Sequence, residues 1–312
     1  RLVGTTGGDM FFYDGLFHEF RGCFSAAQPV RRTTVLASAD ISASLTGVIP
    51  ATAVTPGGWK LVASVTTARN LLWVIINDEG AVVYRGEGVT VASANPFAKA
   101  VAQGTKLILV YHSTGTSDVV AISHETTSGV VVATSPTTVL TLTSSASHYD
   151  VTNYDTSAWY IVGRTAAAST TVSPVSGVTP GTAVTFLTTG EVDLSVWGDS
   201  TNARIWVGYN DDPLGTPTAG FTTYPVPLAA PTYAKTSILV SVALSVPPLF
   251  GPRYSPTGSN ADTFFVLGTL ASTGVYRTRY GHVVAGVPTS TPYIANQTIP
   301  VSKPDVQQRF WV

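Results

Sequence analysis

The chain is short of cysteine, methionine and charge. Its 312 residues include one Cys, one Met and only 11% charged side chains. A single cysteine, Cys23, excludes an internal disulfide and a zinc site built from several thiolates. Soluble domains usually carry about 25% charged residues. We therefore expect a surface of uncharged polar groups on a fold held by packing and sheet hydrogen bonds.

Long runs of one kind are also missing. The net charge is −1, and no run of like charge is longer than a pair such as Arg31–Arg32, which argues against a general nucleic-acid or membrane-surface patch. No stretch approaches about 18 uninterrupted apolar residues, which excludes a transmembrane helix. Because the first residue is Arg1, we expect a processed chain or a piece of a longer one.

The motifs of common enzymes are absent too. His18-Glu19 lacks the second histidine of a zinc protease, and neither a phosphate-binding Gly-rich loop nor a Gly-x-Ser-x-Gly elbow occurs. The single Cys23 is read as a small buried side chain, not as a nucleophile. The sequence therefore predicts no catalytic residue, no cofactor, no metal site and no enzymatic activity.

Threonine is what the chain has in abundance. It holds 45 Thr and 28 Ser, many next to valine, and β-branched residues favour strands. Gly, Pro, Asn and Asp separate the apolar runs, as turns do between strands. One helix is expected, at Asn95–Gln103, because Pro96 suits a first helical position and Gly104 a helix end. The clearest predicted strands are 60–66, 71–76, 81–85, 106–112, 118–124, 158–164, 170–175, 204–209, 221–226, 263–270 and 275–280.

Apolar hairpins recur along the chain. They begin near residues 71, 107, 159, 204 and 263, so their spacing runs from 36 to 59 residues, around the 40–50 residues of a propeller blade. The first strand of each is nearly all apolar, as in Leu71–Ile76, which suits burial on both faces. The second strand is more mixed, as expected of an outer strand.

These patterns predict an all-β fold, a single β-propeller-like domain of about five to seven blades over residues 1–312. Two β-sandwich domains dividing near residue 150 are the alternative, because the turn spacing fits them as well.

Clusters of titratable residues have ordinary interpretations. His112 and His124 lie on the two strands of one predicted hairpin and could hold a metal with Asp118 or Glu125. Solvent-exposed histidines at hairpin ends are favoured instead. The carboxylate pairs 78–79 and 211–212 stand in turns, where Asp bonds to the backbone.

Two groups are candidates for binding. Arg277 and Arg279 share a strand face because they are two residues apart, with Tyr276 and Tyr280 beside them. They suit an interface strand or, less favoured, contact with an anion. Aromatic residues expected at exposed loops could stack on sugars: Trp59, Tyr149 and Tyr154.

Residues 7–15 (Gly-Gly-Asp-Met-Phe-Phe-Tyr-Asp-Gly), the hairpin 71–85 and the Lys-poor, Thr/Ser/Ala/Gly-rich composition resemble the propeller-bearing tail nozzle or tubular proteins of short-tailed bacteriophages. The resemblance implies a non-enzymatic structural component of a phage tail, located in the virion and assembled with other virion proteins as a homo-oligomeric ring. The net charge of −1 departs from the acidic balance expected of a DNA channel and favours an outer propeller.

The alternative function is a glycan-binding or sialidase-like receptor-binding propeller, in the virion or extracellular, whose partner is a host-surface glycan. Neither reading involves membrane insertion or direct nucleic-acid readout.

Overall fold

The computed structural model describes most of the strand-forming part of the chain. The described residues are 2–6, 9–13, 32–36, 51–66, 68–92, 98–127, 130–144, 147–167, 169–187, 191–211, 218–238, 249–252, 263–272, 275–284 and 287–293. Side chains are described within residues 51–232, with gaps, and at Val283. Over this part the regular structure is strand, and it contains no helix long and apolar enough to cross a membrane.

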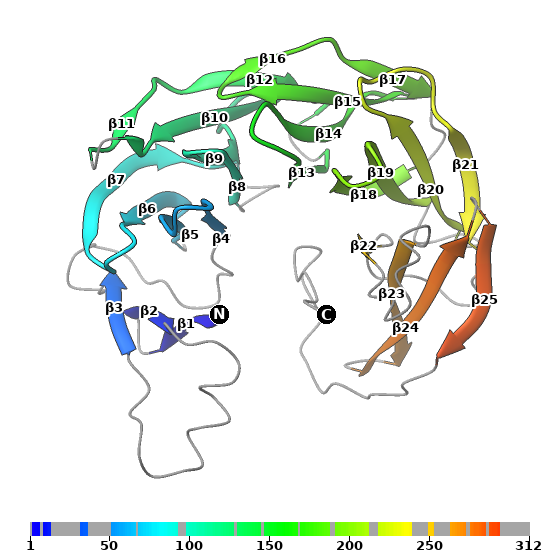
Figure 1. The fold of residues 1–312 in the computed structure, drawn as a ribbon, viewed down its shortest axis with the longest axis horizontal. Helices are drawn as coiled ribbons and strands as arrows, with labels where there is room; N and C mark the ends of the chain where they lie inside the picture. The colour runs from blue at the N-terminus through cyan, green and yellow to red at the C-terminus, as the bar shows by residue number, and fades with distance from the viewer. Residues whose placement is uncertain are drawn as a thin grey trace. The chain divides into compact units, whose positions relative to one another are not determined.

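Contacts divide the chain into two compact units, Arg1–Thr137 and Thr138–Val312. In unit 1 the described strands form three antiparallel sheets (Figure 1). The first has the order β1 (Leu2–Thr6), β2 (Asp9–Tyr13) and β3 (Arg32–Leu36). The second has the order β4 (Ala51–Val54), β5 (Lys60–Val65), β6 (Asn70–Ile76) and β7 (Val82–Thr90). The third contains β8 (Ala98–Gln103), β9 (Lys106–His112), β10 (Asp118–Glu125) and β11 (Val132–Ala133).

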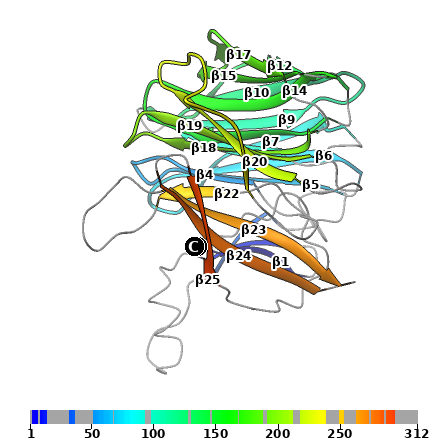
Figure 2. The same ribbon diagram turned by 90° about the vertical axis from the view of Figure 1, so that its right-hand side faces the viewer.

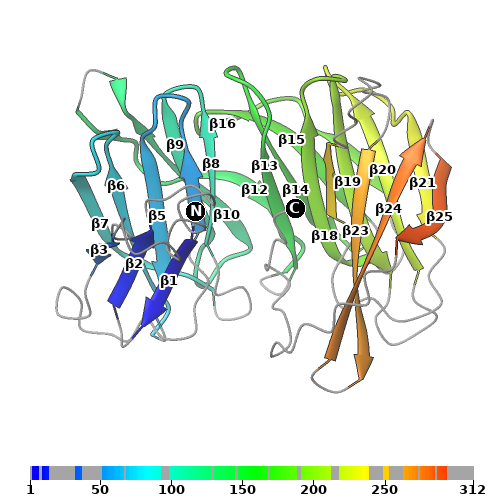
Figure 3. The same ribbon diagram turned by 60° about the horizontal axis from the view of Figure 1, so that its bottom comes forward.

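Unit 2 repeats this organisation. One sheet runs β13 (Tyr149–Asn153), β14 (Trp159–Ala166), β15 (Ser169–Ser176) and β16 (Thr179–Pro180), and β17 (Val184–Leu187) also pairs with β15. The next runs β18 (Glu191–Asp199), β19 (Arg204–Asp211), β20 (Thr218–Pro225) and β21 (Tyr233–Ile238) (Figure 3). The last runs β22 (Leu249–Pro252), β23 (Thr263–Ser272), β24 (Val275–Val284) and β25 (Val287–Tyr293), with β23 and β24 as a long hairpin (Figure 2). Strand β12 (Thr137–Thr141) begins at the boundary between the units.

Apart from β12 and β17, strands that follow one another in sequence lie next to one another within each sheet. This meander order is the order of a propeller blade, whereas a sandwich connects its two sheets by Greek-key crossings. The predicted hairpins are confirmed. For example, β6 and β7 pair from Asn70↔Thr90 to Ile76↔Val82. The sandwich alternative does not fit this connectivity.

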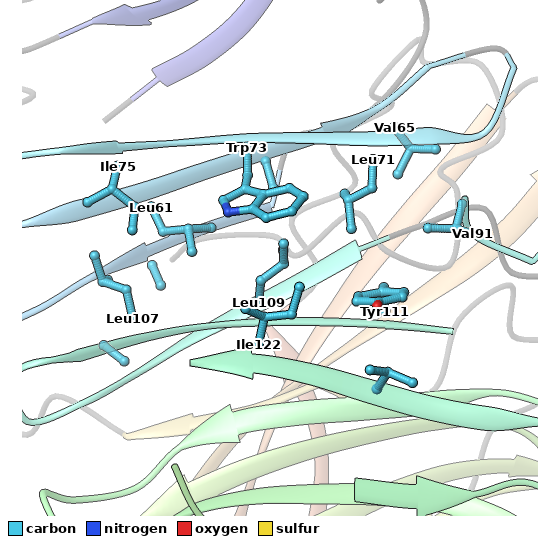
Figure 4. Close-up of a cluster of buried hydrophobic side chains, with 14 residues drawn as sticks. Leu61, Val65, Leu71, Trp73, Ile75, Val91, Leu107, Leu109, Tyr111 and Ile122 are labelled. Carbon is cyan, nitrogen blue, oxygen red and sulfur yellow. The ribbon is translucent and has the colours of Figure 1, made fainter. Parts of the chain in front are cut away.

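The core of unit 1 lies between the β4–β7 and β8–β11 sheets. Alternate residues of each strand face it, so Leu61, Leu71, Trp73 and Ile75 meet Leu107, Leu109 and Ile122 (Figure 4). All residues of Leu71–Ile76 are buried, which confirms burial on both faces. Strand β7 alternates as an outer strand should, but β10 is buried over 119–124 and is flanked by β9 and β11, so it is not an outer strand. The mixed second strand predicted there is wrong.

The helix predicted at Asn95–Gln103 is wrong where the structure describes it. Residues 98–103 are strand β8, which pairs with β9 from Ala98↔Tyr111 to Gln103↔Lys106. Gly104, with φ 56°, opens a two-residue hairpin turn there. Alanine favours helices by well under 1 kcal/mol per residue. Pairing with β9 and burial of Val101, Ala102 and Gln103 outweigh that preference.

The core of unit 2 lies between the β13–β16 and β18–β21 sheets. Tyr160 and Val162 of β14 pack there with Leu194, Val196, Ile205 and Tyr224. Two side chains of β13 also bond to the backbone edge of β18. Asp150 Oδ2 accepts the N–H of Val196 at 2.8 Å, and Thr152 Oγ1 accepts the N–H of Gly198 at 3.1 Å.

Candidate functional site

The loops that join the first and second strands of a sheet carry two of the three aromatic candidates. Among the described residues, these loops are 55–59, 104–105, 154–158 and 200–203, and we call them the first loops below. Trp59 ends the first of them and Tyr154 begins the third. Both side chains are half-buried, so each keeps an accessible part while the rest is fixed by packing.

Tyr154 is the better-defined of the two. Its ring meets Tyr160 edge to face, with ring centroids 5.2 Å apart and planes at 76°. It also lies over Gly198 of β18, since a Cβ on Gly198 would stand 3.1 Å from its Cδ2 atom. The ring is thereby held between β14 and the end of β18.

The charges of two carboxylates influence the pKa of the Tyr154 hydroxyl. Asp155 follows it in the same loop, and Asp199 ends β18. Asp155 Oδ1 accepts the Ser157 N–H at 2.7 Å, the Ser157 hydroxyl at 2.7 Å and the Ala158 N–H at 2.9 Å. Asp199 accepts the backbone N–H of Asn202 at 3.1 Å and its side-chain amide at 2.7 Å. Both loops are therefore closed by their own aspartates.

The pKa values indicate which of these groups carry a proton at neutral pH. Burial, and then the charges of Asp155 and Asp199, raise the pKa of Tyr154 above its ordinary value. Burial, with Tyr154 and Asp155, raises the pKa of Tyr160 to about 12. Burial alone would raise the pKa of Asp155, but the hydrogen bonds from Ser157 and Ala158 outweigh it and lower that pKa. At neutral pH the site presents an ionised Asp155 beside a protonated phenol.

Trp59, in unit 1, lies at the end of a loop that is closed by hydrogen bonds to Thr55. The loop is closed by Thr55, whose N–H donates to the Trp59 carbonyl at 2.9 Å and whose Oγ1 accepts the Trp59 N–H at 3.2 Å. The indole packs partly against the core of unit 1. It offers a half-buried apolar surface.

Tyr149 does not lie on an exposed loop, as the sequence predicted. It begins β13, pairs with Gly163, and is 3% exposed. Burial raises the pKa of its hydroxyl far above the ordinary value. A ring this buried cannot stack on a sugar.

The four residues predicted as an interface or anion contact lie on β24. Arg277 and Arg279 stand opposite Thr269 and Leu267 of β23, while Tyr276 and Tyr280 stand opposite Leu270 and Val266. The four residues therefore lie close together along one strand of the β23–β24 hairpin. Their side chains lie outside the described part, as do Cys23, Asp212 and the ends of the 7–15 segment.

The two histidines of the β9–β10 hairpin are not neighbours. His112 stands opposite Val119 and His124 opposite Leu107, at opposite ends of the pair. Both are fully buried, so the prediction of solvent-exposed histidines is also wrong. Within the described residues no three His, Cys, Asp or Glu side chains come together as a metal site.

Sequence reasoning missed Asp199, the buried carboxylate that acts on Tyr154. Its spacing to Asn202 is a signal of an Asx-type turn. Nothing in the sequence connects that turn to a loop some 45 residues earlier.

Neither the family models nor the curated proteins contain a match to this chain. Solved structures do. AofleA from Arthrobotrys oligospora aligns with a TM-score of 0.54 and 14% identity, over 88% of this chain and 77% of that one. Hydrazine synthase from Kuenenia stuttgartiensis aligns with a TM-score of 0.51 and 12% identity, over 88% and 70%.

The structure of Aleuria aurantia lectin, described as a fungal lectin with a six-bladed β-propeller fold and a novel mode of fucose recognition, aligns with a TM-score of 0.50 and 11% identity, over 95% of each chain. Likeness at this identity shows the fold alone, and the predicted fold class is confirmed: the chain is an all-β protein of the β-propeller fold.

Proposed function

We propose that the chain is a non-enzymatic, carbohydrate-binding propeller whose sugar contact is the first loop around Tyr154. The observation that carries the proposal is the fixed, half-buried Tyr154 ring beside the ionised Asp155. A ring face suits the apolar side of a sugar, while carboxylate oxygens accept hydrogen bonds from its hydroxyls. The fold shared with a fungal lectin that recognises fucose supports the same choice.

The state of the carboxylates favours binding over hydrolysis. A glycosidase needs one carboxylic acid with a raised pKa to protonate the leaving group. The pKa of Asp155 is lowered instead, and both Asp155 and Asp199 are engaged in closing their loops. The sialidase-like alternative would also need an arginine group, for which Arg277 and Arg279 on β24 are the sequence candidates.

The test is a glycan array followed by titration calorimetry with the best-bound sugar. We expect Tyr154→Ala to weaken binding at least tenfold, a loss of about 1.4 kcal/mol. Tyr154→Phe should bind more tightly than Tyr154→Ala because it keeps the ring. The matched control is Tyr84→Ala, which changes a half-buried tyrosine of unit 1 outside the first loops.

If Tyr84→Ala still binds the sugar at a thermal unfolding midpoint equal to that of Tyr154→Ala, the binding lost in Tyr154→Ala is not caused by lost folding. Binding of Tyr154→Ala as tight as that of the unchanged chain contradicts the proposed site. An array without hits contradicts the function, and release of free sugar from a bound glycan contradicts its non-enzymatic character.

A further inference from the structure

His124 joins the two sheets that enclose the core of unit 1. It lies on β10 and is fully buried, on the same face as Val120 and Ile122. Its Nε2 atom accepts the indole N–H of Trp73, on β6 of the other sheet, at 2.9 Å. The Tyr84 ring of β7 meets it edge to face at a centroid distance of 5.3 Å.

Both ring nitrogens of His124 have fixed roles. Because the indole of Trp73 can only donate, Nε2 of His124 must be an acceptor without a proton. The other nitrogen, Nδ1, lies 3.1 Å from the carbonyl oxygen of Leu107 and must donate to it. The contacts therefore fit one neutral tautomer of the ring.

A second proton has no place in this arrangement. It would go to Nε2 and face the Trp73 N–H, so two donors would oppose each other across 2.9 Å. It would also leave a charge in an apolar core, which is costly without a partner.

No charged group among the described residues compensates that charge. The influences on the pKa of His124 are burial and the Leu107 carbonyl. The titratable neighbour on β7 is Tyr84, whose ring edge meets the imidazole. Asp118 shares the His124 face of β10 but stands at the other end of the strand. The remaining charged residues of these strands, apart from Glu87, occupy alternate positions that point to the opposite sheet faces: Lys60, Arg85, Lys99, Lys106 and Glu125. Glu87 of β7 is exposed to solvent.

We propose that His124 is an acid-sensitive latch, which holds the β4–β7 and β8–β11 sheets together while its ring is neutral and releases them when the ring takes up a proton. Release exposes the apolar faces that the two sheets share, including Leu61, Leu71, Leu107 and Leu109. The latch acts in unit 1 and is independent of the proposed sugar site at Tyr154.

The direction and range of the pH effect follow from the ring's environment. Burial lowers the pKa of His124 to about 4, from 6.5. The unfolded chain therefore takes up the proton first, and the latch contributes fully above pH 6.5 and is lost as the pH falls toward 4. A difference of about 2.5 pKa units changes the folding equilibrium about 300-fold across that window.

The test compares urea unfolding of the unchanged chain and His124→Gln between pH 7 and pH 4, followed by tryptophan fluorescence. Glutamine keeps an oxygen that can accept the Trp73 N–H but does not titrate. We expect the unfolding midpoint of the unchanged chain to fall through the window and that of His124→Gln to stay more nearly level. The control is His148→Gln, a half-buried histidine of unit 2, which should follow the unchanged chain. Buried His112, whose pKa burial also lowers, is present in all three and cancels in the comparison.

A second measurement uses the unchanged chain alone, in case His124→Gln does not fold. Hydrogen-exchange protection of β5, β6, β9 and β10 should fall at pH 4.5 relative to pH 7, after correction for intrinsic rates, while that of β14 and β19 persists. Equal pH dependence of the unchanged chain and His124→Gln overturns the latch. So does simultaneous loss of protection in both units, or unchanged protection of unit 1 at pH 4.5.

Discussion

At the scale of single residues, several glycines allow close contacts between neighbouring strands or sheets. Gly198 on β18 lies against the backbone of Asn153, and a Cβ there would overlap the Asn153 carbonyl oxygen. Gly163 on β14 faces Leu140 and Leu142, where a Cβ would approach both side chains to 2.6 Å. Backbone atoms cannot rotate away as a side-chain end can, so Gly198 is the more demanding of these two positions.

We predict that Gly198→Ala lowers the free energy of unfolding by about 1–3 kcal/mol, the usual cost of overpacking. The added methyl group must push β18 away from Asn153 and disturb the Tyr154 ring. Urea unfolding measures the loss. Gly57→Ala is the control, because its Cβ would meet no atom closer than 3.9 Å. Similar stability of the two variants would contradict the close approach.

At the scale of elements, β18 shows how one sheet edge is closed. An edge strand leaves backbone groups unpaired unless something covers them. Asp150 and Thr152, two residues apart on β13, accept the N–H groups of Val196 and Gly198, two residues apart on β18. The match in spacing arises because alternate residues of a strand point the same way.

Asp150→Ala should lower the free energy of unfolding by about 1–3 kcal/mol, because the buried N–H of Val196 loses its acceptor. Asp150→Asn keeps an acceptor oxygen and should lose less. The comparison is made by urea unfolding with Thr152→Val as a third variant, which removes the acceptor of the Gly198 N–H. If alanine and asparagine at position 150 are equally stable, the bond to Val196 does not contribute.

At the scale of the whole molecule, the described sheets share one meander-like strand order, so we expect the residues that determine function to lie in the loops and in the assembly. A propeller places its variable chemistry in the turns between strands, and the same fold serves unrelated purposes. The half-buried aromatic side chains of residues 59 and 154 lie on such turns. The virion role predicted from the resemblance concerns assembly and stays a prediction.

We predict that the native particle is a homo-oligomeric ring with a mass several times the 32.6 kDa of one chain. If β24 is an interface strand, the double variant Arg277→Glu and Arg279→Glu should dissociate the particle because it reverses two charges of that strand. Mass photometry with negative-stain images measures both. Arg85→Glu, on the exposed side of β7, is the control. A monomer of the unchanged chain contradicts the ring, and the sugar-binding proposal then stands by itself.

The sequence alone determined the recurring hairpins and their apolar strands. Continuous apolar runs such as Leu71–Ile76 and turn residues such as Asn77 and Gly80 act locally, so their effect can be read from neighbours in the chain. Here the turn closes with the Ala81 N–H donating to Asn77 Oδ1 at 2.7 Å and with Gly80 at φ 89°. The repeated hairpin spacing favoured a propeller but also fitted two sandwiches, and the order of the strands within each sheet decided between them.

Only the tertiary structure decided what residues far apart in the chain do to one another. Residues 98–103 became a strand because β9 offered an edge and a core to bury them in. His124 became a buried acceptor because Trp73, 51 residues away, donates to it. The charge of Asp199 raises the pKa of Tyr154 because β13 packs beside β18. Such pairings depend on which sheets stack face to face, and that choice is made by the packing of whole sheets, which leaves no local pattern in the sequence.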